Sequence, residues 1–488
     1  DVASHLIGYI GEISKEELRS YSTQGINSYH VQDMIGKSGL EKEYEAYLKG
    51  IDGVRQVEVN NVGEMIKELG TKPPISGNDI YLNINLDFQR NVEKILENHI
   101  NRLIQEAADD PERYKPTGGS ALVINPNNGK VLAMASFPDF NLNTFSQGIS
   151  AKEYQELSND PMNPMLNRNI MVSVLPGSLF KLVTGAAAIK YLDINGNTEF
   201  IDNNGLFYIP DWSRPFRNWH SGGEGELDFT KAIARSNNIV FYQLGYDLYE
   251  KYGGKNLIRT AGEFGLGKKT QIDLPEEKSG ALPIIEDGQI KRNWYPGDSV
   301  NLSIGQGGLL TTPIQLVNYI SSIANKGTLY QPYIVDMIKN TDGDVVYDQK
   351  SKVLKELDYN NTLFETLQQG MEEVTMSSYG TARSTFLDFP VTVAGKTGTA
   401  QTSRENVSHG WFGGYAPVDD PKIAVLVFLE NGSSSSYTLP IAGDIIKEYF
   451  GYRSNDEKEV ENNQVNAIKT IDDNANLLDY ISGVFSSE

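Results

Sequence analysis

The longest apolar run of the chain is Ile423-Ala424-Val425-Leu426-Val427-Phe428-Leu429, which predicts a strand buried in the core. Shorter strand-like runs precede it at residues 391–394 and 411–415. Further upstream, the apolar residues 121–124 and 131–134 flank Pro126-Asn127-Asn128-Gly129, a turn sequence that predicts a hairpin. Helix-like segments fill the middle of the chain. We therefore expect a mixed sheet with a helical subdomain, an α/β (α+β) fold.

The composition divides the chain into three parts. The breaker-rich stretch Thr71-Lys72-Pro73-Pro74-Ile75-Ser76-Gly77 marks a boundary, so residues 1–78 form the first predicted domain and residues 79–453 the second. Residues 454–488 begin as an acidic linker and end in a short apolar helical face. We interpret that face as a terminal helix docked on its own domain, with a partner-binding helix as the alternative. The other predicted elements are helices at residues 39–50 and 88–107 and a strand at residues 80–84.

The chain is acidic and contains no cysteine. Its 488 residues include 43 Lys and Arg against 64 Asp and Glu, a formal net charge of −21. This charge is opposite to the basic footprint of nucleic-acid-binding proteins, so we expect no nucleic-acid partner. The absence of cysteine excludes disulfides, thiol nucleophiles and metal sites built on cysteine. The longest apolar run is also far shorter than the roughly 18 residues of a membrane span.

The first candidate for chemistry is Ser178-Leu179-Phe180-Lys181, which follows Pro176-Gly177 and opens an apolar stretch. Proline and glycine supply a turn and a helix start, so Ser178 and Lys181 lie about one helical turn apart on the same face. A serine hydroxyl needs a base beside it to act as a nucleophile, and a lysine can be that base when its charged form is destabilised. Taken alone, the pair is equally compatible with a solvated helix start.

Two further elements become informative together with the first. In Ser236-Asn237-Asn238, Ser236 can relay a proton and Asn238 can bind a substrate amide, although a turn or helix cap explains the triplet alone. Lys396-Thr397-Gly398-Thr399 follows the predicted strand at 391–394, and its lysine and hydroxyls suit a substrate carboxylate. Gly398 leaves room for a ligand against the backbone, while an ordinary edge strand is the alternative.

The order of the three elements is characteristic. A Ser-x-x-Lys, a Ser-x-Asn and a Lys-Thr-Gly element in this order are the signature of penicillin-binding proteins and serine β-lactamases. The chain resembles a class B penicillin-binding protein, a monofunctional peptidoglycan D,D-transpeptidase. Other segments that fit this resemblance lie at residues 36–50, 125–136, 167–168, 305–307, 312–315, 409–412 and 414–417.

The resemblance implies a penicillin-binding-protein/serine β-lactamase-like transpeptidase fold with an N-terminal pedestal domain, present here only in part. It implies that Ser178 attacks the carbonyl between two terminal D-alanines, that Lys181 takes its proton and that Ser236 relays it to the leaving amine. Lys396 helps keep Lys181 neutral. The oxyanion is held by the backbone N–H groups of Ser178 and Thr399.

The resemblance also assigns the substrate contacts. Lys396, Thr397 and Thr399 bind the terminal carboxylate, with Gly398 beside them, and Asn238 binds the peptide amide. An amine from a neighbouring strand then completes the crosslink. β-Lactams enter as analogues of the stem peptide and leave slowly.

Partners, location and cofactors follow from the same resemblance. Peptidoglycan stem peptides and β-lactams are the expected ligands, and proteins of a cell-wall synthesis complex are expected on the pedestal. A single-pass anchor in the cell membrane, missing from this chain, places the catalytic domain outside the cytoplasm. No cofactor is expected. We also expect no metal, because Glu224 stands where relatives often have histidine and the chain has no cysteine.

Two alternatives stay open at this point. A serine β-lactamase or D,D-carboxypeptidase shares the three elements but transfers the acyl group to water. A β-lactam-binding sensor or scaffold of a cell-wall complex does not process D-Ala-D-Ala at all. Among the remaining polar and aromatic residues, we expect His409 to support a strand junction rather than to catalyse. For Trp219 and His220 we expect packing, with shaping of the cleft as the alternative.

Overall fold

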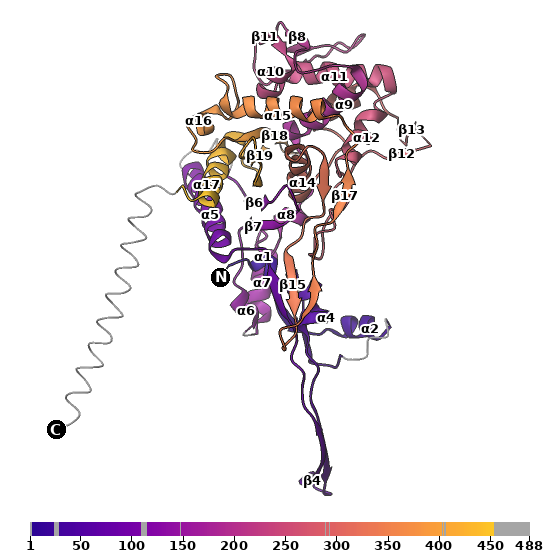
Figure 1. The fold of residues 1–488 in the computed structure, drawn as a ribbon, viewed down its shortest axis with the longest axis vertical. Coiled ribbons are helices and arrows are strands. Elements are labelled where there is room, and N and C mark those ends of the chain that lie inside the picture. Colours follow the sequence, from indigo (N-terminus) through magenta and orange to yellow (C-terminus); the bar gives the residue numbers. More distant parts are fainter. Residues whose placement is uncertain are drawn as a thin grey trace, which may run out of the picture.

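The computed structural model describes residues 2–23, 29–108, 115–146, 148–287, 289–291, 293–402, 404 and 407–452. The predicted linker and tail at residues 454–488 lie outside the described residues. The molecule is elongated, with a helical subdomain at one end and a long hairpin at the other (Figure 1). Within the described ranges, no helix combines the length and apolar character needed to cross a membrane.

A five-stranded antiparallel sheet forms the centre, in the order β18-β19-β20-β6-β7. Its strands are β6 (Gly118–Ile124), β7 (Val131–Phe137), β18 (Ala394–Gln401), β19 (Ser408–Ala416) and β20 (Ile423–Glu430). The predicted hairpin at 121–134 and the buried strand at 423–429 are confirmed. The sheet is antiparallel throughout rather than mixed, and its combination with helices confirms the predicted α/β (α+β) fold class.

The strand predicted at residues 391–394 was placed too early. β18 begins at Ala394 and contains Lys396, Thr397 and Gly398 themselves, paired with β19 from Ala394–Tyr415 to Gln401–Ser408. The apolar run therefore marks the approach to the strand rather than the strand. The ladder of backbone hydrogen bonds defines β18. A search for apolar runs misses this strand, because several of its residues are polar.

Both faces of the sheet are covered by helices, which explains why β20 is apolar without alternation. Leu426 and Phe428 pack on the side of α14 (Pro313–Ala324). Val425 and Val427 pack on the opposite side, against α5 (Leu86–Ala108) and α17 (Thr438–Phe450). Successive residues of a strand point to opposite faces, so a strand between two helical layers must be apolar throughout.

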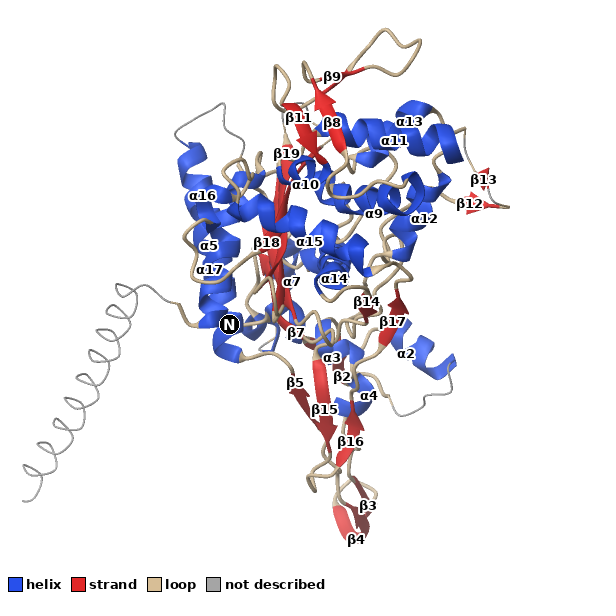
Figure 2. Ribbon diagram, turned by 45° about the horizontal axis from the view of Figure 1, so that its top comes forward, coloured by secondary structure: helices blue, strands red, loops and turns tan. Residues whose placement is uncertain are grey.

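The helical subdomain packs beside β18 (Figure 2). Its centre is α9 (Lys181–Leu192), whose residues Lys181 to Ala188 are all buried. The other helical elements of the subdomain are η1 (Gly177–Phe180), α10 (Phe229–Ala234), α11 (Asn238–Tyr252), α12 (Lys255–Glu263), α13 (Pro296–Ser303) and α15 (Asn361–Met376). Of these, η1, α11, α12 and α15 pack against α9, and the buried part of this helix is largely apolar after Lys181.

The N-terminal part docks on the rest through buried apolar side chains, among them Leu6, Leu40 and Tyr44, and through polar contacts. Tyr44 Oη donates to Asp273 Oδ2 at 3.0 Å, and Lys42 Nζ lies 2.8 Å from Glu276 Oε1. The helix predicted at 39–50 is two short helices separated at Tyr44. The N-terminal elements are α1 (Ser4–Ile7), β1 (Ile10–Glu12), α2 (Lys15–Thr23), β2 (Met34–Gly36), α3 (Gly39–Glu43), α4 (Glu45–Leu48), β3 (Val54–Val59) and β4 (Met65–Lys72).

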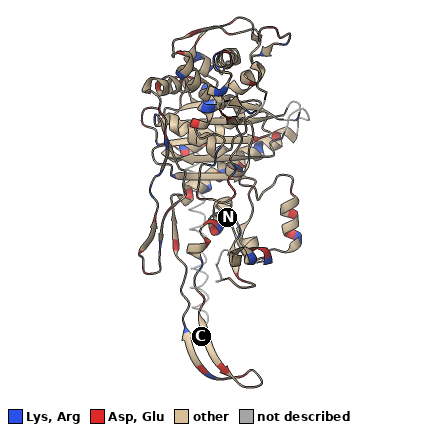
Figure 3. Ribbon diagram, turned by 90° about the vertical axis from the view of Figure 1, so that its right-hand side faces the viewer, with Lys and Arg blue, Asp and Glu red and all other residues tan. Residues whose placement is uncertain are grey.

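β3 and β4 form the protruding hairpin, which carries charged residues of both signs (Figure 3). β4 extends to Lys72, so the predicted breaker stretch at 71–77 begins inside a strand. The chain then returns through β5 (Asp79–Leu82), which pairs with β15 (Val335–Lys339). The remaining elements are α6 (Leu142–Ser146), α7 (Ala151–Asn159), α8 (Arg168–Met171), β8 (Glu199–Asp202), β9 (Leu206–Phe207), β10 (Phe216–Arg217), β11 (Gly225–Asp228), β12 (Ile285–Glu286), β13 (Gln289–Ile290), β14 (Thr328–Tyr330), β16 (Val345–Asp348), β17 (Val353–Glu356), α16 (Arg383–Phe386) and η2 (Ser435–Tyr437).

Candidate active site

The three sequence elements meet at one cleft of about 740 Å³. Ser178 reaches it from η1, Ser236 and Asn238 from the turn between α10 and α11, and residues 397–399 from β18. Lys181 and Lys396 lie behind its wall, because both side chains are fully buried. Elements far apart in the sequence are thus brought to one place, as the order of the motifs predicted.

The turn that presents Ser178 is held tightly against β18. Gly177 has φ +54, and a Cβ there would lie 2.5 Å from Thr399 O. A Cβ at Gly398 would lie 3.1 Å from Pro176 O. Both glycines are required because the turn and the strand approach each other closely. The missing side chain of Gly398 serves this packing, a reason different from the ligand approach that the sequence suggested.

Lys181 is the most perturbed group of the site. Its Nζ lies 2.6 Å from Ser236 O, 3.2 Å from Ser236 Oγ and 2.7 Å from Asn238 Oδ1. Burial holds the pKa of Lys181 well below its usual range, Lys396 lowers this pKa further, and Glu224 opposes both. A neutral amine offers two N–H donors and one lone pair. Donation to Ser236 O and Asn238 Oδ1 leaves that lone pair as a base beside the hydroxyl of Ser236.

Ser236 and Asn238 owe their positions to a strained turn. Ser236 has φ +52, a left-handed conformation that is uncommon for a residue with a side chain. Asn237 follows as the N-cap of α11, where its Oδ1 accepts from Val240 N at 3.0 Å. Asn238 Nδ2 donates to Arg217 O at 3.2 Å. The turn thereby directs both the main-chain oxygen and the hydroxyl of Ser236 at Lys181.

The β18 side of the cleft consists of the hydroxyls of Thr397 and Thr399, with the buried amine of Lys396 behind them. Burial lowers the pKa of Lys396 to about 7, and its Nζ donates to Thr397 O at 3.1 Å. Thr397 Oγ1 lies 2.9 Å from Thr381 Oγ1, and Thr399 Oγ1 accepts from Ser435 N at 3.4 Å. The strand is at the edge of the sheet, with its second side free of any strand among the described residues.

Trp219 lines the cleft, which was the less favoured of its two predicted roles. The favoured prediction, packing, is wrong, because Trp219 is 55% exposed and lines the cleft with Arg217. Trp219 Nε1 donates to Arg235 O at 3.1 Å, which fixes the indole at the rim. No local pattern marks this tryptophan, since its place depends on a contact with a residue of another element.

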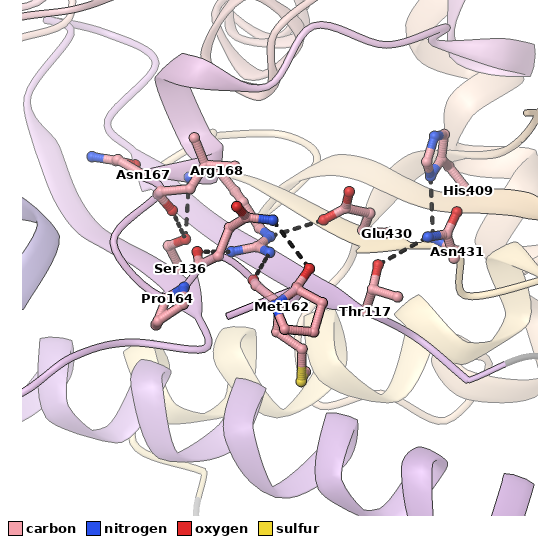
Figure 4. A network of polar contacts seen from close by, with 12 residues as sticks. Thr117, Ser136, Met162, Pro164, Asn167, Arg168, His409, Glu430 and Asn431 are labelled. Atoms are coloured by element: carbon pink, nitrogen blue, oxygen red, sulfur yellow. Dashed lines mark hydrogen bonds and ion pairs between the residues drawn. The ribbon is translucent and has the colours of Figure 1, made fainter. Parts of the chain in front are cut away.

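His409 lies on β19, away from Ser178. Its Nδ1 accepts from Asn431 N at 3.1 Å, in agreement with the predicted support of a strand junction (Figure 4). The same region holds the buried Arg168, whose Nε donates to Glu430 Oε2 at 3.0 Å (Figure 4). Arg168 is 1% exposed, so this ion pair ties α8 to the end of the central strand β20.

Among the residues that the structure describes, no group of three or more His, Asp or Glu side chains could hold a metal ion. The nearest acidic side chains to the cleft already have protein donors. Asp202 accepts from Gly205 N at 2.7 Å and from Asn218 Nδ2 at 3.0 Å, and Glu224 accepts from Arg235 Nε at 2.6 Å.

Comparisons with known families and proteins agree with this geometry. The model of the penicillin binding protein transpeptidase domain matches residues 119–450. The model of the penicillin-binding protein dimerisation domain matches residues 1–82. The peptidoglycan D,D-transpeptidase MrdA of Haemophilus influenzae is 31% identical over 474 residues, which are 93% of this chain and 69% of that protein.

Solved structures show the same fold. A penicillin-binding protein, PBP2, of Helicobacter pylori in complex with MreC has a TM-score of 0.74 at 29% identity, covering 93% of this chain and 78% of that one. PBP2 of Pseudomonas aeruginosa in complex with WCK 5153 has a TM-score of 0.72 at 30% identity, covering 91% and 89%. The resemblance inferred from the motifs is confirmed. The chain belongs to the penicillin-binding proteins, as a class B peptidoglycan D,D-transpeptidase with an N-terminal dimerisation domain.

Proposed function

We propose that this chain crosslinks peptidoglycan stem peptides through an acyl-enzyme on Ser178, and that β-lactams acylate the same serine. The observation that carries the proposal is the fully buried Lys181, whose Nζ lies within 3.2 Å of Ser236 Oγ behind the cleft that Ser178 lines. A lysine in such a place is a base rather than a cation at neutral pH.

In the first half of the reaction, Lys181 takes the proton of Ser178 as the serine oxygen attacks the carbonyl between two D-alanines. The new C–O bond produces an oxyanion, which the backbone N–H groups of Ser178 and Thr399 stabilise. Such a donor contributes about 10²–10³ in rate. Ser236 passes the proton to the leaving nitrogen, the C–N bond breaks and D-alanine departs. An amine of a second stem peptide then attacks the ester and restores the serine.

Substrate binding falls to the two walls of the cleft. Thr397 and Thr399 receive the terminal carboxylate, and Asn238 hydrogen-bonds the peptide amide. Lys396, buried beside Lys181, contributes positive charge below the carboxylate and disfavours protonation of Lys181. The edge of β18 lets the extended peptide add to the sheet.

Mass spectrometry after treatment with penicillin tests the proposal on the wild-type chain and on Ser178→Ala. The wild type gains one stable penicilloyl adduct, and the variant gains none. An adduct on the variant, or none on the wild type, would overturn the assignment. Rapid turnover of penicillin would instead indicate a β-lactamase. Stem peptides supplied with and without an amine acceptor separate crosslinking from carboxypeptidase activity and from a sensor that processes neither.

We further propose that the pedestal docks a protein of a cell-wall synthesis complex and that the full-length protein is anchored in the cell membrane. Support comes from the H. pylori relative, which is in complex with MreC. The β3–β4 hairpin also exposes apolar side chains, with Val59, Val62 and Ile66 at 51%, 72% and 62%.

Ile66→Asp should weaken binding of a purified cell-wall complex protein and leave penicillin acylation at the wild-type rate. Val345→Asp, at a residue on β16 that is 54% exposed, is the matched control and should bind normally. Equal binding by both variants would refute the hairpin as the docking site.

A further inference from the structure

A buried polar cluster surrounds the turn that carries Ser236, and the reaction described above uses none of its members. The turn cluster consists of Asp202, Glu224, Arg235 and Asn237. Asp202 is 1% exposed and Asn237 is 0% exposed, while the side chain of Glu224 is 6% exposed. Charged groups are stable in such a place only when specific partners replace water.

Asn237 lies at the centre of the cluster. Its Nδ2 donates to Asp202 Oδ2 at 2.8 Å and to Glu224 Oε2 at 2.7 Å, while its Oδ1 accepts from Val240 N at 3.0 Å. An asparagine amide has two N–H donors, and both are in use. Asn237, which follows Ser236, is therefore fixed by hydrogen bonds with Asp202, Glu224 and Val240.

Arg235, the residue before Ser236, is fixed by contacts of its side chain and its main chain. Its Nε donates to Glu224 Oε1 at 2.6 Å, its Nη2 pairs with the same oxygen, and its Nη1 donates to Tyr379 O at 3.0 Å. Its main-chain oxygen accepts from Trp219 Nε1 at 3.1 Å. Glu224 thus joins Arg235 to Asn237 across the back of the turn.

Ser236 lies between these two clamped residues with φ +52. Its conformation is unfavourable for an L residue, so the surroundings must impose it. It is also the conformation that places Ser236 O and Oγ at 2.6 Å and 3.2 Å from Lys181 Nζ. We propose that the turn cluster positions Ser236 on Lys181 and that Arg235 neutralises Glu224 there, so that the base stays uncharged. The proposal rests on the catalytic roles proposed above for Ser178, Lys181 and Ser236.

The charges around Lys181 explain why the ion pair matters. Lys396 on β18 faces it and lowers its pKa, while Glu224, preceding β11, raises it. The neighbours from α11 are uncharged, with Asn238 Oδ1 at 2.7 Å and the ring centre of Phe241 5.3 Å from Nζ. Glu224 is the anion whose charge raises the pKa of this lysine, and it is paired with Arg235 through Nε and Nη2.

The test is the pH dependence of acylation by a fluorescent penicillin in the complete chain. Acylation requires neutral Lys181, so its rate rises with pH through the pKa of this lysine. Glu224→Gln keeps an acceptor for Asn237 and removes the charge, so the midpoint of the rise moves to lower pH. Arg235→Gln leaves Glu224 unbalanced, so the midpoint moves to higher pH. At a pH below the midpoint, the acylation rate falls about tenfold for each unit of that shift.

Two more variants separate position from charge. Arg235→Lys keeps the charge and should retain the wild-type midpoint. Asn237→Ala removes the clamp and should slow acylation at every pH without moving the midpoint. Glu430→Gln breaks another Arg–Glu pair, that of Arg168, and serves as the control whose midpoint stays at the wild-type value.

Acylation at Ser178 with the same midpoint in Glu224→Gln and Arg235→Gln, or with shifts in one direction, overturns this inference alone. Loss of the Ser178 dependence of acylation overturns the proposed function and this inference with it. Thermal melting of each variant confirms that the compared proteins are folded.

Discussion

At the scale of single residues, the site places two amines in the interior of the protein. Burial lowers the pKa of Lys396 to about 7 from 10.5, and it lowers the pKa of Lys181 as well. The unfolded chain binds more protons than the folded chain between these values. The free energy of unfolding therefore rises with pH from about 7 to 10.5 through these groups, by about 1.4 kcal/mol for each unit of pKa difference. The two buried lysines with lowered pKa therefore reduce the free energy of unfolding at neutral pH.

Replacement of Lys396 tests this relation. Lys396→Met should raise the melting temperature at pH 7, because an apolar side chain of similar length needs no deprotonation when buried. The same variant should acylate at least about tenfold more slowly, since the pKa of Lys181 rises when the neighbouring charge is removed. Differential scanning calorimetry and penicillin acylation at pH 7 give the two quantities. A lower melting temperature at pH 7 would contradict the account.

At the scale of elements, the contact between η1 and β18 sets the geometry of attack. Gly177→Ala adds a Cβ 2.5 Å from Thr399 O at a residue with φ +54. Either the turn or the strand must move, so acylation should fall by about tenfold or more, as misplacement of a reacting group does. Gly63→Ala, at the hairpin turn where a Cβ meets no atom within 4 Å, is the control with a similar backbone conformation. Equal acylation by both variants would show that the contact is not critical.

The central strand β20 is where stability is concentrated. Leu426→Ala removes a side chain that is 1% exposed between the sheet and α14, and we expect a loss of about 2–5 kcal/mol in the free energy of unfolding. Val346→Ala on β16 removes a side chain that is 47% exposed and should change stability by less than about 1 kcal/mol. Urea denaturation of the two variants measures the difference.

Elements differ in how far a sequence predicts them. β20 was found because helices cover both its faces, so its apolar run is uninterrupted. β18 was placed too early, because the residues that form the cleft are polar and small. The helix expected at 39–50 breaks at Tyr44, whose hydroxyl reaches Asp273. The motif residues were assembled as predicted, whereas the Arg235–Glu224 pair and the exposed Trp219 depend on contacts between elements that no local pattern contains.

At the scale of the whole molecule, the helical subdomain and the β3–β4 hairpin lie at opposite ends (Figure 1). Asp273 joins the N-terminal domain to the rest of the chain. Asp273 accepts from Tyr44 Oη at 3.0 Å and from the main-chain N–H groups of Ile334 and Val335 at 2.8 Å each. Burial raises the pKa of Asp273. The carboxylate thus connects the N-terminal domain to the strand β15.

Loss of this connection should loosen the N-terminal domain without affecting the cleft. Tyr44→Phe removes one hydrogen bond and should increase amide hydrogen exchange in β5 and α3, at a cost of about 1 kcal/mol. Penicillin acylation should remain at the wild-type rate. Faster exchange around Ser178 in this variant would show that the two ends are coupled more strongly than these contacts indicate.

The position of β18 at the rim of the sheet has one more consequence. In an extended chain the carbonyl groups alternate in direction, so a peptide laid along β18 offers only every second carbonyl to the serine. In the binding mode proposed above, a slip by one residue would turn the reactive bond away, and a slip by two residues would move the terminal carboxylate off Thr397 and Thr399. The two-residue repeat of the strand edge would then help to select the last peptide bond of the substrate.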